Sequence, residues 1–95
     1  MVKKTRTAPS GQKRKPRRET LELLSDNIRV LRVQQRYSQE VLAQEAGIHR
    51  TYVGDLERCE QNPTLATLEA LADALDVRIA DLLLPVEKRS RKRAP

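Results

Sequence analysis

The sequence is poor in the residues that build metal, disulfide and aromatic sites. Its 95 residues include one cysteine, one histidine, two tyrosines and neither phenylalanine nor tryptophan. A lone cysteine cannot form an internal disulfide, and one cysteine with one histidine cannot supply a four-ligand zinc site. No apolar run approaches the roughly 20 residues that span a bilayer, and the basic N-terminus lacks the apolar segment of a secretory signal. We therefore expect a cytoplasmic protein without a metal or a membrane partner.

Catalytic patterns are missing as well. The three glycines form no phosphate-binding loop, and the single histidine stands in no Ser/His/Asp order that suggests a triad. We expect no enzyme, no cofactor and no small-molecule ligand.

Charge is abundant but unevenly placed. The chain has a formal net charge of +6, yet residues 1–18 carry +8, residues 85–95 carry +4, and residues 19–84 carry −6. The two basic segments contain proline and too few apolar side chains to offset the entropy of ordering them. We therefore expect disordered basic tails at 1–18 and 85–95 around a single folded domain at 19–84. Such tails favour an anionic partner such as nucleic acid.

Helical periodicity dominates the middle of the chain. Apolar residues from Leu21 to Leu31 follow steps of three and four, which predicts a helix running to about Gln35. Ser38 and Thr64 are suited to cap the second and fourth helices, and Gly47 to end the second. A third helix is expected from about residue 49 or 50, and a fifth from 79 to 84. The sequence thus predicts an all-α, compact five-helix domain.

The second and third predicted helices are joined by a short turn, Ala46-Gly47-Ile48-His49. Two short helices joined by a glycine-containing turn match the DNA-binding helix-turn-helix, whose second helix enters the major groove.

Residues 24–83 also resemble the lambda-repressor-like, Cro/C1-type helix-turn-helix family (XRE). The matching strings are 28–32 (IRVLR), 38–43 (SQEVLA), 46–48 (AGI), 56–58 (LER) and 62–65 (NPTL). The string 50–53 (RTYV) followed by 56–58 is similar to restriction–modification controller proteins within that family. The resemblance implies a five-helix domain that binds operator DNA as a two-fold dimer. It also implies a buried structural ion pair between Arg32 and Glu57.

Three positions depart from the family pattern. Cys59 stands where glycine is usual, so a non-glycine residue must adopt or avoid a left-handed conformation there. Arg78 replaces a better cap before the fifth helix, and His49 replaces a serine or threonine at the head of the third.

Candidate DNA contacts follow from the predicted third helix. Its outward face offers arginine donors for guanine, a methyl group for thymine and a carboxylate for cytosine, so the predicted base contacts are Arg50, Thr51, Tyr52 and Asp55. An alternative role for Asp55 is to orient an arginine. Side chains flanking the same surface are predicted phosphate contacts: Gln39, Arg36, Arg58, Gln61 and Asn62.

The run Leu82-Leu83-Leu84 exceeds what a small core can bury, so we expect at least one of these leucines in a dimer interface. Together these features predict a nucleoid-associated homodimer that binds double-stranded DNA at a near-palindromic operator and regulates transcription. The sequence does not distinguish repression from activation. Two alternatives stay open, namely an antitoxin-type or partner-binding helix-turn-helix module, and a sequence-indifferent nucleic-acid binder driven by its tails.

Overall fold

Four α-helices and one short 3-10 helix occur in the part of the chain that the structure describes. The structure, a computed structural model, describes residues 15–85, and no strand occurs among them. The helices are α1 (Arg18–Gln34), α2 (Gln39–Ala46), α3 (Arg50–Glu57) and α4 (Leu65–Leu75), followed by the 3-10 helix η1 (Ile79–Leu83). The predicted all-α class is confirmed. Most of both predicted tails lies outside the described residues, and α1 begins at Arg18, one residue before the expected domain boundary.

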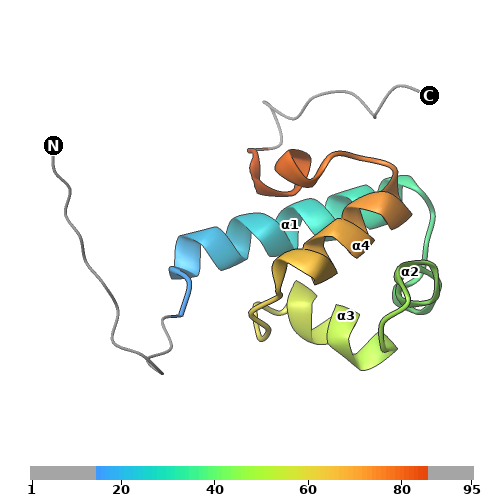
Figure 1. The fold of residues 1–95 in the computed structure, drawn as a ribbon, viewed down its shortest axis with the longest axis horizontal. Helices are drawn as coiled ribbons and strands as arrows, with labels where there is room; N and C mark the ends of the chain where they lie inside the picture. The colour runs from blue at the N-terminus through green and yellow to red at the C-terminus, as the bar shows by residue number, and fades with distance from the viewer. Residues whose placement is uncertain (1–14, 86–95) are drawn as a thin grey trace, which may run out of the picture.

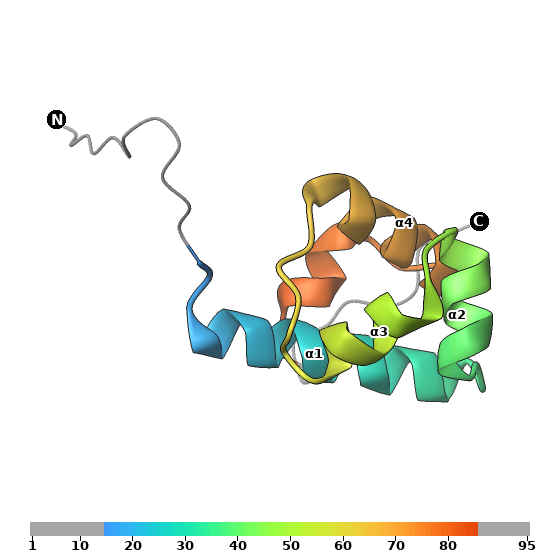
Figure 2. The same ribbon diagram turned by 90° about the horizontal axis from the view of Figure 1, so that it is seen from below.

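Helix α1 packs against η1 on one side and α3 on the other, and α4 packs against η1 and α2 (Figure 1). Helix α2 packs at the far end, next to α3 and α4. One apolar core joins all five elements, and its fully buried side chains include Ile28, Leu42, Val53, Leu71 and Leu82. In the view from below, no other helix lies in front of α3 (Figure 2), and the first two residues of α3 are exposed.

The predicted caps explain where α2, α3 and α4 begin. Ser38 Oγ accepts a hydrogen bond from the Val41 amide at 3.0 Å, and Thr64 Oγ1 accepts from the Thr67 amide at 3.2 Å. His49 serves the same purpose for α3, since its Nδ1 accepts from the Thr51 amide at 3.1 Å. These side chains satisfy amides that have no partner within the helix.

A left-handed residue follows each of the four α-helices, namely Arg36, Gly47, Cys59 and Asp76. Gly47 has φ 72° and closes α2, as the sequence predicts. Cys59 adopts φ 64°, the left-handed conformation expected of the glycine that is usual at this position in the family. Its Sγ lies 3.2 Å from Ser25 Oγ of α1. The chain can therefore turn sharply after α3 without a glycine.

The segment after α4 differs from the prediction. The expected fifth α-helix at 79–84 is the 3-10 helix η1, which ends at Leu83. Asn27, fully buried on α1, donates hydrogen bonds to the carbonyl oxygens of Leu82 at 3.0 Å and Leu84 at 2.7 Å. The Arg78 side chain has no acceptor that could cap η1. Instead Asp81, which lies within η1, accepts a hydrogen bond at its Oδ2 from the Arg78 amide at 3.1 Å.

One predicted interface residue is corrected by this arrangement. Leu82 is 0% exposed and belongs to the core, so it cannot lie in a dimer interface. Leu83 is 41% exposed and Leu84 is half-buried, which leaves these two as the candidates for contact with a second copy. Leu82 and Leu83 differ in exposure because η1, a short 3-10 helix hydrogen-bonded to Asn27, directs consecutive side chains to different sides.

Candidate nucleic-acid interface

Helix α3 presents its first turn to solvent. Arg50 and Thr51 are both exposed, and they follow directly after the tight turn at Gly47. Arg50 Nε lies 3.5 Å from Glu40 Oε2 on α2, so this arginine extends over the start of the neighbouring helix. The two residues predicted as principal base contacts are thus both exposed, and they are the first two residues of α3.

The opposite end of α3 is fixed by a buried ion pair. Arg32 Nε and Nη2 donate to the Glu57 carboxylate at 2.6 and 3.1 Å, and the side chains are only 15% and 5% exposed. The remaining Nη1 of Arg32 donates to the Tyr37 carbonyl oxygen at 2.9 Å. The pairing that the family resemblance implies therefore joins α1 to the end of α3.

Two further residues strengthen this junction. Gln39 Nε2 of α2 donates to Glu57 Oε1 at 3.0 Å, and Arg29 Nη2 donates to the Glu57 backbone carbonyl at 2.9 Å. A cation near the last carbonyl groups of a helix also interacts favourably with the negative end of the helix dipole. Three helices thus meet at Glu57, and the orientation of α3 relative to α2 is set there.

The environment of the Gln39 side chain therefore differs from the one that the sequence predicts. The sequence predicts a phosphate contact, whereas the structure gives its amide group an internal partner in Glu57. The side chain is half-buried, and one of its two N–H groups serves the junction. Its first role in this structure is to position α3.

Tyr52 also differs from the outward placement expected for it. It is half-buried and packs against the apolar core. Burial raises the pKa of its hydroxyl above the ordinary value of 10.0, and a side-chain hydrogen bond with Thr67 partly offsets this rise. Because Thr67 belongs to α4, Tyr52 connects α3 to α4 through a neutral hydroxyl.

Asp55 is engaged with neighbouring side chains. Its Oδ1 accepts a hydrogen bond from Arg58 Nη2, and its Oδ2 lies 3.5 Å from Gln61 Nε2. The arrangement matches the alternative role predicted for it, that of orienting an arginine. Arg58, Asn62 and Arg36 are exposed and Gln61 is half-buried; Arg36 occupies the turn after α1 with φ 63°.

Sequence reasoning missed Gly54, which lies in the middle of α3. An ideal Cβ built there would be 3.3 Å from Arg58 Nη1 and 3.5 Å from Gln39 Oε1. Gly54 is buried because these two polar groups cover it. A glycine inside a short helix is itself a signal, since it costs about 1 kcal/mol relative to alanine and needs a packing reason.

Gly54→Ala is therefore expected to separate stability from binding. The added methyl group favours the helix by about 1 kcal/mol, and its close neighbours are the ends of flexible side chains that can move by a few tenths of an ångström. The same movement displaces the Arg58 guanidinium from its position beside residue 54. We expect an unchanged or raised melting temperature together with weaker binding to the preferred duplex, measured by thermal unfolding and fluorescence anisotropy. Unchanged binding would show that the position of Arg58 is immaterial.

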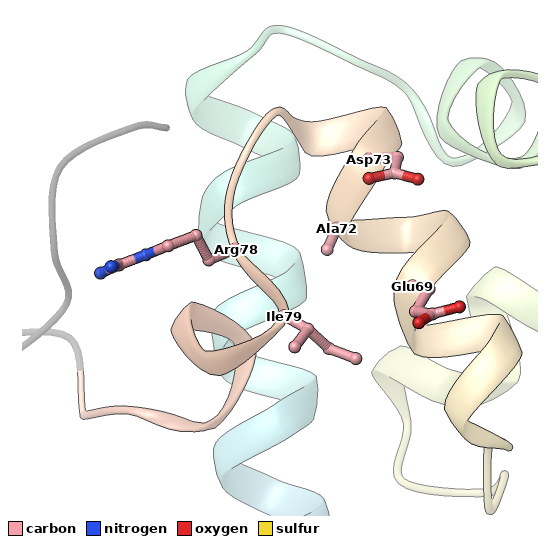
Figure 3. Close-up of a pocket in the computed structure, with 5 residues that line it drawn as sticks. All are labelled: Glu69, Ala72, Asp73, Arg78 and Ile79. Carbon is pink, nitrogen blue, oxygen red and sulfur yellow. The ribbon is translucent and has the colours of Figure 1, made fainter. Parts of the chain in front are cut away.

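The surface also has a groove that lies away from α3. Figure 3 shows a groove between α4 and η1, lined by Glu69, Ala72, Asp73, Arg78 and Ile79. None of the candidate DNA contacts lines it. Within residues 15–85, no cluster of three or more histidine, cysteine or acidic side chains is arranged to hold a metal ion, and no helix is long and apolar enough to cross a membrane.

Comparison with known proteins agrees with this geometry. The helix-turn-helix family HTH_3 matches residues 28–82. Control protein C.SmaI from Serratia marcescens is 48% identical over 62 residues, which cover 65% of this chain and 74% of that protein. The crystal structure of the hypothetical transcription factor NHTF from Neisseria superposes with a TM-score of 0.71 at 38% identity, covering 82% of this chain and 91% of that one.

A second similar structure contains DNA. The restriction-modification controller protein C.Esp1396I, a tetramer in complex with its natural 35 base-pair operator, has a TM-score of 0.62 and 30% identity, covering 66% of this chain and 83% of that one. The match of the family to more than half of the chain and the similarity to two controller proteins lead to one conclusion. The chain belongs to the HTH_3 helix-turn-helix family of the Cro/C1 type.

Proposed function

We propose that this protein is a sequence-specific DNA-binding transcriptional regulator that acts as a homodimer on a near-palindromic operator. The observation that carries the proposal is the placement of α3. Its first turn exposes Arg50 and Thr51, while its last residue, Glu57, is fixed to α1 and α2. A helix held in this way can enter the major groove as a rigid unit.

The relatives support DNA as the partner and regulation as the role. One relative is a control protein, and another controller protein is bound to its natural operator. In the proposal Arg50 donates two hydrogen bonds to a guanine, and Thr51 contacts a thymine methyl group. The phosphate contacts in the proposal are Arg36, Arg58, Gln61 and Asn62, and they fix the register of the protein on the duplex.

The basic tails have a different role in the proposal. Residues 19–84 carry −6, so the excess positive charge lies outside the folded domain. Lys15, Pro16 and Arg17, the described end of this segment, line a shallow surface together with Asn62, a predicted phosphate contact. Its lysines and arginines therefore add sequence-independent attraction to phosphates near the proposed interface.

For the homodimer, the exposed Leu83 and the half-buried Leu84 provide the apolar contact. Helix η1, which ends at Leu83, lies on the side of the domain opposite α3 (Figure 1), so a partner bound there leaves α3 uncovered. Two recognition helices in such a dimer would read half-sites about 34 Å apart.

Selection of bound sequences from a random duplex pool tests the proposal. We expect one enriched motif with two-fold symmetry and half-sites about 10 base pairs apart. Binding to this motif should persist in a thousandfold excess of bulk DNA, as typical specificity ratios allow. Equal affinity for every duplex would instead identify a sequence-indifferent binder. Enrichment of an asymmetric motif would contradict the homodimer.

A further inference from the structure

The exposed arginines of α3 and the turn after it are paired with carboxylates. Arg58 donates through Nη2 to Asp55 and lies with Nε 3.3 Å from Glu60 Oε1. Arg50 Nε lies 3.5 Å from Glu40 Oε2. The predicted base and phosphate contacts thus include two guanidinium groups that already have anionic partners.

These pairs restrict where each arginine can point. Arg58 is held from two sides, by Asp55 of α3 and by Glu60 just beyond it. Its third nitrogen, Nη1, lies over Gly54, 3.3 Å from the position of a built Cβ. Gln61 Nε2 lies 3.5 Å from the other oxygen of Asp55 and restrains that carboxylate in turn. These contacts together favour one direction of the Arg58 guanidinium relative to α3.

We infer that Glu40 and Glu60 are specificity-determining residues, which act by restraining Arg50 and Arg58 and by partly neutralising them. The inference rests on the proposed function and adds to it a role for two acidic residues that contact no base in the proposal. Asp55 belongs to the same set, as the partner that orients Arg58.

A paired arginine and a released arginine differ in the acceptors that they can reach. A released arginine can turn to whichever phosphate is nearest, and phosphates occur at every step of any duplex. A paired arginine keeps its direction, so its remaining N–H groups bond only an acceptor that the sequence places there. It must also give up its carboxylate before it can move to a phosphate. The pairs therefore weaken binding to non-cognate DNA more than binding to the operator.

Glutamine at positions 40 and 60 tests this inference in the full chain. Glu40→Gln and Glu60→Gln keep the shape of the side chain and remove its charge. Glu69→Gln is the matched control, because Glu69 is exposed and lies in the groove between α4 and η1 (Figure 3). The dissociation constants for the selected operator and for a scrambled duplex of the same length are measured at several salt concentrations.

We expect each interface variant to bind the scrambled duplex about two- to fivefold more tightly, the range that an exposed ion pair accounts for. Operator affinity should change less, so the specificity ratio falls. The salt dependence on the scrambled duplex should steepen by up to about 0.9 in log-log slope for each arginine released to a phosphate. Glu69→Gln should leave the ratio unchanged.

An equal gain on both duplexes in all three variants would reduce the effect to net charge and overturn the inference. Loss of operator affinity with no gain on the scrambled duplex would also overturn it, because the carboxylates would then be base contacts. If the unsubstituted protein showed no preference between the duplexes, the proposed function itself would fail. That outcome is recognised before any variant is compared.

Discussion

Arg32→Ala is expected to destabilise the domain by about 3–5 kcal/mol, the cost of leaving the partner of a buried ion pair uncompensated. Glu57 would keep its charge at 5% side-chain exposure and lose both hydrogen bonds from Arg32. The carbonyl oxygen of Tyr37 would lose its donor as well. Such a loss approaches the total stability of many small domains, so the variant is to be measured by urea denaturation at low temperature.

Arg18→Ala is the matched control for this experiment. Arg18 lies on the same helix and pairs with Glu22 at 3.0 Å, but the two side chains are 69% and 54% exposed. An exposed pair of this kind contributes at most about 1 kcal/mol. If Arg32→Ala unfolded at the same urea concentration as Arg18→Ala and yet lost DNA affinity, Arg32 would be a DNA contact rather than a structural residue.

Features encoded within a few neighbouring residues could be predicted from the sequence. Ser38, Gly47 and Thr64 mark helix ends because their effects depend on backbone groups three or four positions away. The periodic leucines identify the inward faces of the helices for the same reason. The ion pair of Arg32 and Glu57 spans 25 residues, and it was accessible only through resemblance to a family.

Features that depend on the packing of distant elements could not be predicted. Three consecutive leucines give no indication of which one enters the core, and the choice of Leu82 is fixed by hydrogen bonds from Asn27, 55 residues earlier. The engagement of Gln39 with Glu57 depends in the same way on the angle between α2 and α3. The direction of Tyr52 depends on how closely α4 approaches, since the predicted outward face takes account of α3 alone.

Arg50→Ala is expected to weaken binding to the selected operator by about 1–3 kcal/mol, which is the discrimination of one bidentate arginine–guanine contact. Arg50 is exposed at the start of α3, where the first residues of a recognition helix reach the base edges. The preference should relax at one base pair in each half-site, while affinity for a scrambled duplex changes little. Binding to the operator and to its single-position variants, measured by fluorescence anisotropy, gives this pattern directly.

Arg36→Ala supplies the contrast. Arg36 lies on the turn between α1 and α2, so its loss should weaken operator and scrambled duplexes alike and lower the log-log salt slope by about 0.9. Since Arg50→Ala also leaves Glu40 without its partner, the comparison is repeated in a Glu40→Gln background. A uniform loss for Arg50→Ala in that background would mean that Arg50 bonds a phosphate. The reading of sequence would then have to come from other residues on the open face of α3, with Thr51 as the first to be replaced.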